Sequence, residues 1–78
     1  MTIKQANKKA GSLTNNKRVI LIMEHEGGDL TTEDTLILFA NLIKTGLAWS
    51  LQGHYGRGAT NIIRQGYINK AGEILKLN

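Results

Sequence analysis

Residues 29–47 constrain the fold most, because they combine helical apolar spacing with signals for both ends of a helix. The stretch reads DLTTEDTLILFANLIKTGL. A Thr hydroxyl followed by two acids suits the positive N-terminal end of a helix. Apolar side chains recur at helical spacing at Leu36, Phe39, Ala40, Ile43 and Leu47, with Leu38 and Leu42 widening the stripe. The stretch therefore predicts a helix closed by a left-handed Gly46, with Leu47 folding back onto Leu42.

A second helix is predicted because the same ending recurs twenty residues later. NLIKTGL at 41–47 and NIIRQGY at 61–67 both read Asn, aliphatic, Ile, basic, polar, Gly, apolar. The second copy predicts a helix over about 57–65, closed by Gly66, with Tyr67 packing on Ile62. Shared helix-capping physics explains the match as well as a duplication does.

Two other segments complete the predicted architecture. VILIM at 19–23 fits either a buried strand or a short buried helix that stops at Gly27 and Gly28, and we favour the helix. Near the end, YI at 67–68 and IL at 74–75 flank a turn-rich NKAG, which predicts a β-hairpin, with a frayed helix as the alternative. The predicted fold is mainly α: three short helices and a C-terminal β-hairpin around one core.

Length and composition narrow the class of protein. A chain of 78 residues forms one domain around a small core. Cysteine is absent, which excludes disulfides and thiolate metal sites. No apolar run is long enough to span a membrane and the N-terminal stretch is polar, so we expect neither a membrane partner nor a signal peptide.

Charge is segregated along the chain. Residues 1–18 contain no acid and five basic side chains: Lys4, Lys8, Lys9, Lys17 and Arg18. Residues 19–35 contain five acids and no Lys or Arg, and residues 36–78 are again basic. Because residues 1–18 have few apolar side chains and no periodicity, we predict a flexible basic arm over 1–18 and a small helical domain over 19–78. Such an arm acts either as a solubilising tail or in nucleic-acid binding.

GLAWSLQGHYGRG, residues 46–58, holds the only Trp, one of two Tyr, one of two His and four of nine Gly. Trp49 and Leu51 are predicted to lie in the core, since a lone Trp in a small domain is first a packing element. The glycines of GHYGRG allow a sharp bend. We predict that this corner displays a partner-binding set: Gln52, His54, Tyr55 and Arg57. The alternative is a tight turn between two helices in which the Tyr and His side chains hydrogen-bond locally.

Catalytic and metal chemistry has little support in this sequence. The only cluster of side chains suited to acid–base catalysis or metal binding consists of Glu24, His25, Glu26 and His54. Because adjacent residues on a helix point to different faces, Glu24 and Glu26 would not converge on one site. Two His and no Cys make a poor metal-ligand set. We therefore expect no enzyme, no cofactor and no metal.

The corner also carries a resemblance. With the preceding GDLTTEDTLILFANLIKT, it is similar to a family of small tailed-bacteriophage proteins, over about Ile20 to Ile68. The residues that carry the signature are Gly46, Leu47, Ala48, Trp49, Leu51, Gln52, Gly53, His54, Tyr55, Gly56 and Arg57. Relatives commonly have a small polar residue where this chain has Gly58. The resemblance implies a phage origin, action in the host cytoplasm and an accessory role, and it carries over no catalytic residue.

Two hypotheses for function follow. The first is a non-catalytic phage protein that binds a host or viral protein, as an inhibitor in host takeover or anti-defence, because aromatic and Arg side chains are common interface anchors. The alternative is a DNA- or RNA-binding module of winged-helix type. Its contacts would come from the arm (Lys4, Lys8, Lys9, Lys17, Arg18), the second helix (Arg57, Thr60, Asn61, Arg64) and Lys70 on the wing. Homo-oligomerisation is compatible with both.

Overall fold

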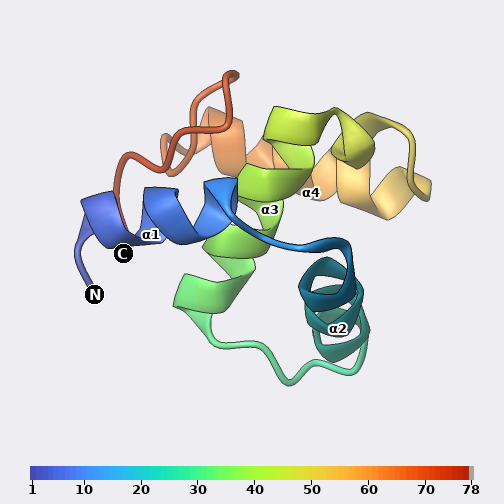
Figure 1. The fold of residues 1–78 in the computed structure, drawn as a ribbon. Helices are drawn as coiled ribbons and strands as arrows, with labels where there is room; N and C mark the ends of the chain where they lie inside the picture. Colours follow the sequence, from blue (N-terminus) through green and yellow to red (C-terminus); the bar gives the residue numbers. More distant parts are fainter. Residues whose placement is uncertain (78) are drawn as a thin grey trace.

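The computed structural model describes residues 1–77, which form four α-helices and one short 3₁₀ turn (Figure 1). The elements, in chain order, are α1 (Ile3–Gly11), α2 (Asn15–Glu26), α3 (Thr32–Thr45), the 3₁₀ turn η1 (Leu47–Trp49) and α4 (Gly53–Arg64). The described residues contain no strand or sheet. The mainly α prediction is right, and the number of helices exceeds the predicted three.

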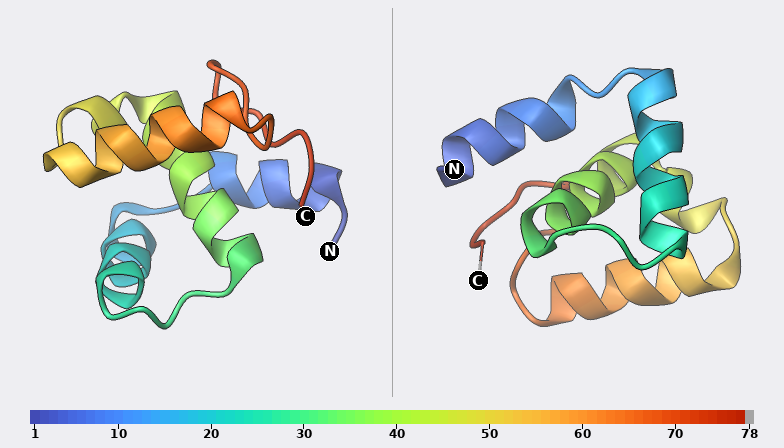
Figure 2. Two further views of the ribbon diagram at one scale, coloured as in Figure 1. Left: turned by 180° about the vertical axis from the view of Figure 1, so that it is seen from behind. Right: turned by 90° about the horizontal axis from the view of Figure 1, so that it is seen from below.

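Helix α3 is the centre of the fold. Every side chain from Leu36 to Ile43 is buried, and α1 and α4 lie on opposite sides of it (Figure 2). Its ends follow the prediction: the Asp34 backbone N–H donates to the Thr31 hydroxyl at 3.1 Å, and Gly46 adopts φ +80°. Local sequence thus fixes the length of this helix, and the apolar side chains on all sides make it the core.

The predicted flexible arm is wrong, because its first part is helix α1, packed on α3. Thr2 and Gln5 form a capping box: the Gln5 backbone N–H donates to the Thr2 hydroxyl, and the Thr2 backbone N–H donates to the Gln5 side chain. Ala6 and Ala10, one helical turn apart, are fully buried. Two alanines give too weak an apolar pattern to predict a packed helix, yet their small size allows close approach to α3.

The predicted boundary between a flexible arm and a helical domain, after residue 18, falls inside α2. The buried side chain of Asn41 on α3 links α1, which precedes this boundary, to α2 and α3. The Asn41 side-chain amide donates to the Ala10 carbonyl at 2.8 Å and accepts a 2.8 Å hydrogen bond from Arg18 Nε. Arg18 also donates to Asn15 Oδ1 at 3.0 Å. Asn41 therefore ties α1 and α2 to α3.

Helix α2 confirms helix over strand for residues 19–26, and it ends at Gly27 and Gly28 as predicted. The predicted burial is wrong. Of the apolar run, Leu21 is buried, but Val19, Ile20 and Met23 are about half or more exposed. Five consecutive apolar residues cover all sides of a helix, and α2 turns only one side toward α3.

The predicted C-terminal hairpin is wrong. Within the described residues, 68 and 74 form an isolated antiparallel bridge with no ladder beyond it. The Asn7 side chain accepts from the Ile74 backbone N–H at 2.7 Å and donates to its carbonyl at 3.1 Å, so an amide from α1 takes the place of a neighbouring strand. The Asn69 carboxamide oxygen accepts from the backbone N–H groups of residues 71 and 73, which closes the turn.

Helix α4 begins at Gly53, about one turn earlier than predicted. Its end is as expected: Gly66 adopts φ +81°, and the Tyr67 backbone N–H donates to the Ile62 carbonyl at 3.2 Å. The earlier start decides which way the side chains of the glycine-rich corner point.

Candidate nucleic-acid interface

Tyr55 is turned into the fold, so its predicted display to solvent is wrong. Its side chain is 2% exposed, and its hydroxyl donates to Glu26 Oε1 at 3.1 Å. Its ring packs near the rings of His25 and Phe39. Because α4 already includes residues 54–57, Tyr55 and Arg57 lie about 200° apart around the helix, and burying one exposes the other.

The environment of Tyr55 favours its neutral form. Burial raises the pKa of the phenol to about 12, and the hydrogen bond to Glu26 and the negative charge of that carboxylate act in the same direction. Tyr55 is therefore a packing residue that joins α4 to α2.

Three of the predicted partner-binding residues are exposed. Gln52 precedes α4, and its carbonyl accepts the Tyr55 backbone N–H at 2.9 Å. His54 lies at the start of the helix with its ring 4.2 Å from the Tyr55 ring, between centroids. Arg57 is exposed on the opposite side of the helix from Tyr55.

Trp49, predicted to lie in the core, is 54% exposed. The 3₁₀ turn directs the neighbouring Ala48 inward, where it is fully buried, and leaves the indole outside. Leu51 is half-buried against the core. The sequence indicated that Trp49 matters for packing, but the geometry of the 3₁₀ turn places its side chain at the surface.

The outer face of α4 brings together the four residues predicted for the second helix of a nucleic-acid-binding module. Arg57, Thr60, Asn61 and Arg64 follow i, i+3, i+4, i+7 spacing and are all exposed. They line one shallow, open groove with Trp49 and three glycines, Gly53, Gly56 and Gly58. Trp49 is the residue of this groove that sequence reasoning missed.

The glycines have different roles in the groove. A Cβ on Gly56 would lie 3.8 Å from Trp49 Cε3, so the indole lies directly against the helix at this position. A Cβ on Gly53 would lie 3.1 Å from Arg57 Nη1, so the guanidinium extends over Gly53. Gly58 instead permits close packing on the core, because its Cβ would approach the Phe39 ring at 3.2 Å.

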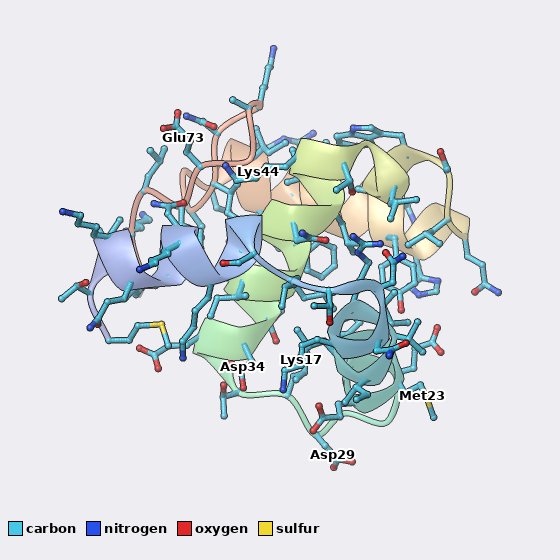
Figure 3. All side chains as sticks on the ribbon, viewed as in Figure 1. Lys17, Met23, Asp29, Asp34, Lys44 and Glu73 are labelled. Carbon is cyan, nitrogen blue, oxygen red and sulfur yellow. The ribbon has the colours of Figure 1, made fainter. Side chains whose placement is uncertain are left out.

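The groove lies in a segment without acidic residues, since none occurs between Asp34 and Glu73. Asp29 lies in the α2–α3 connection and Asp34 in the first turn of α3 (Figure 3), and neither lines the groove. Glu26 bonds Tyr55 on the inward side of α4. The outer face of α4 therefore presents two guanidiniums without a neighbouring carboxylate from its own helix.

The other basic residues of the predicted interface do not join this face. Those of α1, namely Lys4, Lys8 and Lys9, are on the opposite side of α3 from α4 (Figure 2). Lys17 lies on α2 and lines a separate hollow with Lys9 and Asp34, and Arg18 is held by Asn41. Lys70 is exposed in the C-terminal turn. The basic residues predicted to form one nucleic-acid-binding surface are therefore distributed over separate parts of the fold.

Residues 1–77 contain no group of three or more His, Cys, Asp or Glu side chains arranged to hold a metal ion. Among the same residues, no helix has the length and apolar character needed to cross a membrane.

The chain matches a protein-family model over most of its length. Residues 14–78 fit the family model described as Domain of unknown function (DUF7417). The chain belongs to this family. The DUF7417 match includes α2, α3, Trp49 and the whole of α4, whereas α1 precedes it. No curated protein and no solved structure matches the chain. The DUF7417 match does not test the predicted phage origin, which stays a prediction.

Proposed function

We propose that this DUF7417 chain is a non-catalytic nucleic-acid-binding protein that uses the outer face of α4. The observation that carries the proposal is the gathering of Arg57, Thr60, Asn61, Arg64 and exposed Trp49 along one groove. Guanidiniums bind phosphate oxygens, and hydroxyl and amide groups bind phosphates, sugars and base edges.

The size of the charged surface limits the strength of this binding. Two arginines contribute about two phosphate contacts, which corresponds to a log–log salt slope of about −1.4 on a single strand and about −1.8 on a duplex. We expect affinity that falls with salt, but less steeply than if the lysines of α1 lay on the same surface.

The test is a binding titration of dye-labelled oligonucleotides, followed by anisotropy, with Arg57→Gln plus Arg64→Gln. Loss of two charge-assisted contacts is expected to weaken binding by at least about 10-fold. The matched control is Lys4→Gln plus Lys8→Gln, which removes the same charge from exposed positions of α1. We expect the control to stay within about 3-fold of the wild type.

Equal weakening by the two double variants would mean that overall charge, and not α4, governs binding. Absence of binding by the wild type at low salt would refute the proposal outright. Circular dichroism melting of each variant distinguishes loss of contacts from loss of fold.

A second candidate function is favoured by a different surface. Val19, Ile20 and Met23 form an exposed apolar face on α2, and the Met23 side chain points away from the fold (Figure 3). We propose this face as the contact if the chain binds a host or viral protein, as the phage resemblance predicts, because exposed apolar patches mark interaction sites. A specific partner retained in lysate by the wild type and lost on Val19→Lys plus Met23→Lys would support it, and a partner set unchanged by these substitutions would exclude it.

A further inference from the structure

We infer that the α4 groove is selective for single-stranded nucleic acid, with an unpaired base stacked on the indole of Trp49. This inference rests on the proposed function and names its substrate class. Trp49 is 54% exposed, although Trp is the largest side chain in this chain and an apolar core lies beside it. An exposed aromatic ring next to cationic side chains is the arrangement by which single-strand binders hold bases.

The surroundings of the indole leave room for a planar ligand. Gly56 and Gly53 follow one another along the groove, and neither carries a side chain beyond the backbone. The indole lies against the helix at Gly56, and the Arg57 guanidinium extends over Gly53. A base that stacks on the exposed part of the indole therefore lies close to a phosphate-binding group, the Arg57 guanidinium.

The two arginines are placed to follow a strand. Arg57 and Arg64 are seven residues apart on one face, which is about 10 Å along the helix axis. Thr60 and Asn61 lie between them and provide a hydroxyl and a carboxamide. These groups donate and accept, so they suit the base edges that an unpaired strand exposes.

The energetic balance favours the single strand over the duplex. Two phosphate contacts give little electrostatic affinity for a duplex, which needs several of them to bind tightly. Stacking adds about 1–3 kcal/mol per base, and only an unpaired base is free to stack on a protein ring. The groove is lined by no lysine, and α1, which carries three of them, lies on the opposite side of α3 from α4 (Figure 2).

Trp49 is the only Trp in the chain, so its fluorescence reports directly on the site. The experiment titrates the full chain with oligothymidylate of about 12 nucleotides and, separately, with the same strand paired to oligoadenylate. We expect the single strand to quench Trp49 emission and to bind more tightly than the duplex.

Variants are compared by anisotropy of dye-labelled single strand and duplex. Trp49→Leu keeps an apolar side chain but removes the aromatic face, and is expected to weaken single-strand binding by about 5- to 100-fold and duplex binding far less, because paired bases do not stack on the ring. Trp49→Phe is expected to restore part of the loss. The matched control is Met23→Leu on α2, also at an exposed apolar position, and it is expected to bind as the wild type does.

The results separate this inference from the proposed function. Duplex binding equal to or tighter than single-strand binding, or a Trp49→Leu variant that binds the single strand normally, overturns the inference. In both cases a loss of affinity on Arg57→Gln plus Arg64→Gln still supports nucleic-acid binding through α4. Absence of binding to either form overturns both.

Discussion

The ends of α3 and α4 carry the same motif in different surroundings. In NLIKTGL and NIIRQGY, the glycines adopt φ +80° and +81°, and each donates its backbone N–H to the carbonyl three residues before it. Yet Asn41 is buried and ties three helices together, whereas Asn61 is exposed in the α4 groove. Local sequence sets how each helix ends, and the position of the helix in the fold sets what its side chains do.

Substitution of the aliphatic residue that follows Asn should produce the largest difference in stability loss between the two copies of the motif. Leu42 is fully buried, and Leu42→Ala is expected to lower the free energy of unfolding by about 2–5 kcal/mol through lost burial and a cavity. Ile62 is half-buried, so Ile62→Ala should cost less than half as much. Denaturant unfolding measures both, and equal losses would contradict the assignment of α3 as the centre.

The Asn position tests whether the buried amide is structural. Asn41→Leu removes hydrogen bonds to the Ala10 carbonyl and Arg18 Nε and leaves both partners unsatisfied, for an expected loss of about 1–3 kcal/mol. Asn61→Leu is the matched substitution at an exposed site and is expected to change stability by less than about 0.5 kcal/mol. Thermal melting measures both variants, and equal melting temperatures would show that Asn41 does not tie the helices together.

Substitution of the glycine should lower the stability of the protein by the same amount in either copy of the motif. Gly46→Ala and Gly66→Ala each place a Cβ in open space but in the left-handed region, so both are expected to cost about 1–2 kcal/mol. Gly72→Ala is the contrasting case, because its Cβ would lie 2.9 Å from the Ala40 carbonyl and clash with α3. Chemical denaturation that ranks Gly72→Ala no higher than the other two would contradict the close packing of the C-terminal turn.

The last test concerns the inner face of α4 and its stability at high pH. The folded state raises the pKa of Tyr55 from 10.0 to about 12, so the unfolded chain ionises first as the pH rises. The stability that Tyr55 contributes is complete below about pH 10 and is lost between about pH 10 and pH 12. Tyr55→Phe is expected to reduce this loss, measured as melting temperature against pH. A wild type and variant with parallel pH profiles would mean that Tyr55 is not buried against Glu26.

Helix signals in the sequence predicted α3, the end of α4 and the helical state of α2, because capping residues and apolar spacing act within a few residues of the chain. They failed for α1, where two alanines are a weak pattern, and for the C-terminal segment, where the Asn7 amide replaces a strand. The corner was correctly identified as unusual, but Trp49 and Tyr55 were assigned to the wrong sides.

The sequence by itself determined where the helices stop and which residue types gather near the corner, since helix caps and glycine conformations depend on neighbouring residues. Only the tertiary structure decided which face of each helix meets the core. The start of α4 at Gly53 rotates Tyr55 inward and Arg57 outward, and the η1 turn buries Ala48 in place of Trp49. Side-chain direction depends on helical phase and on the packing of distant segments, and neither is a property of a short stretch of chain.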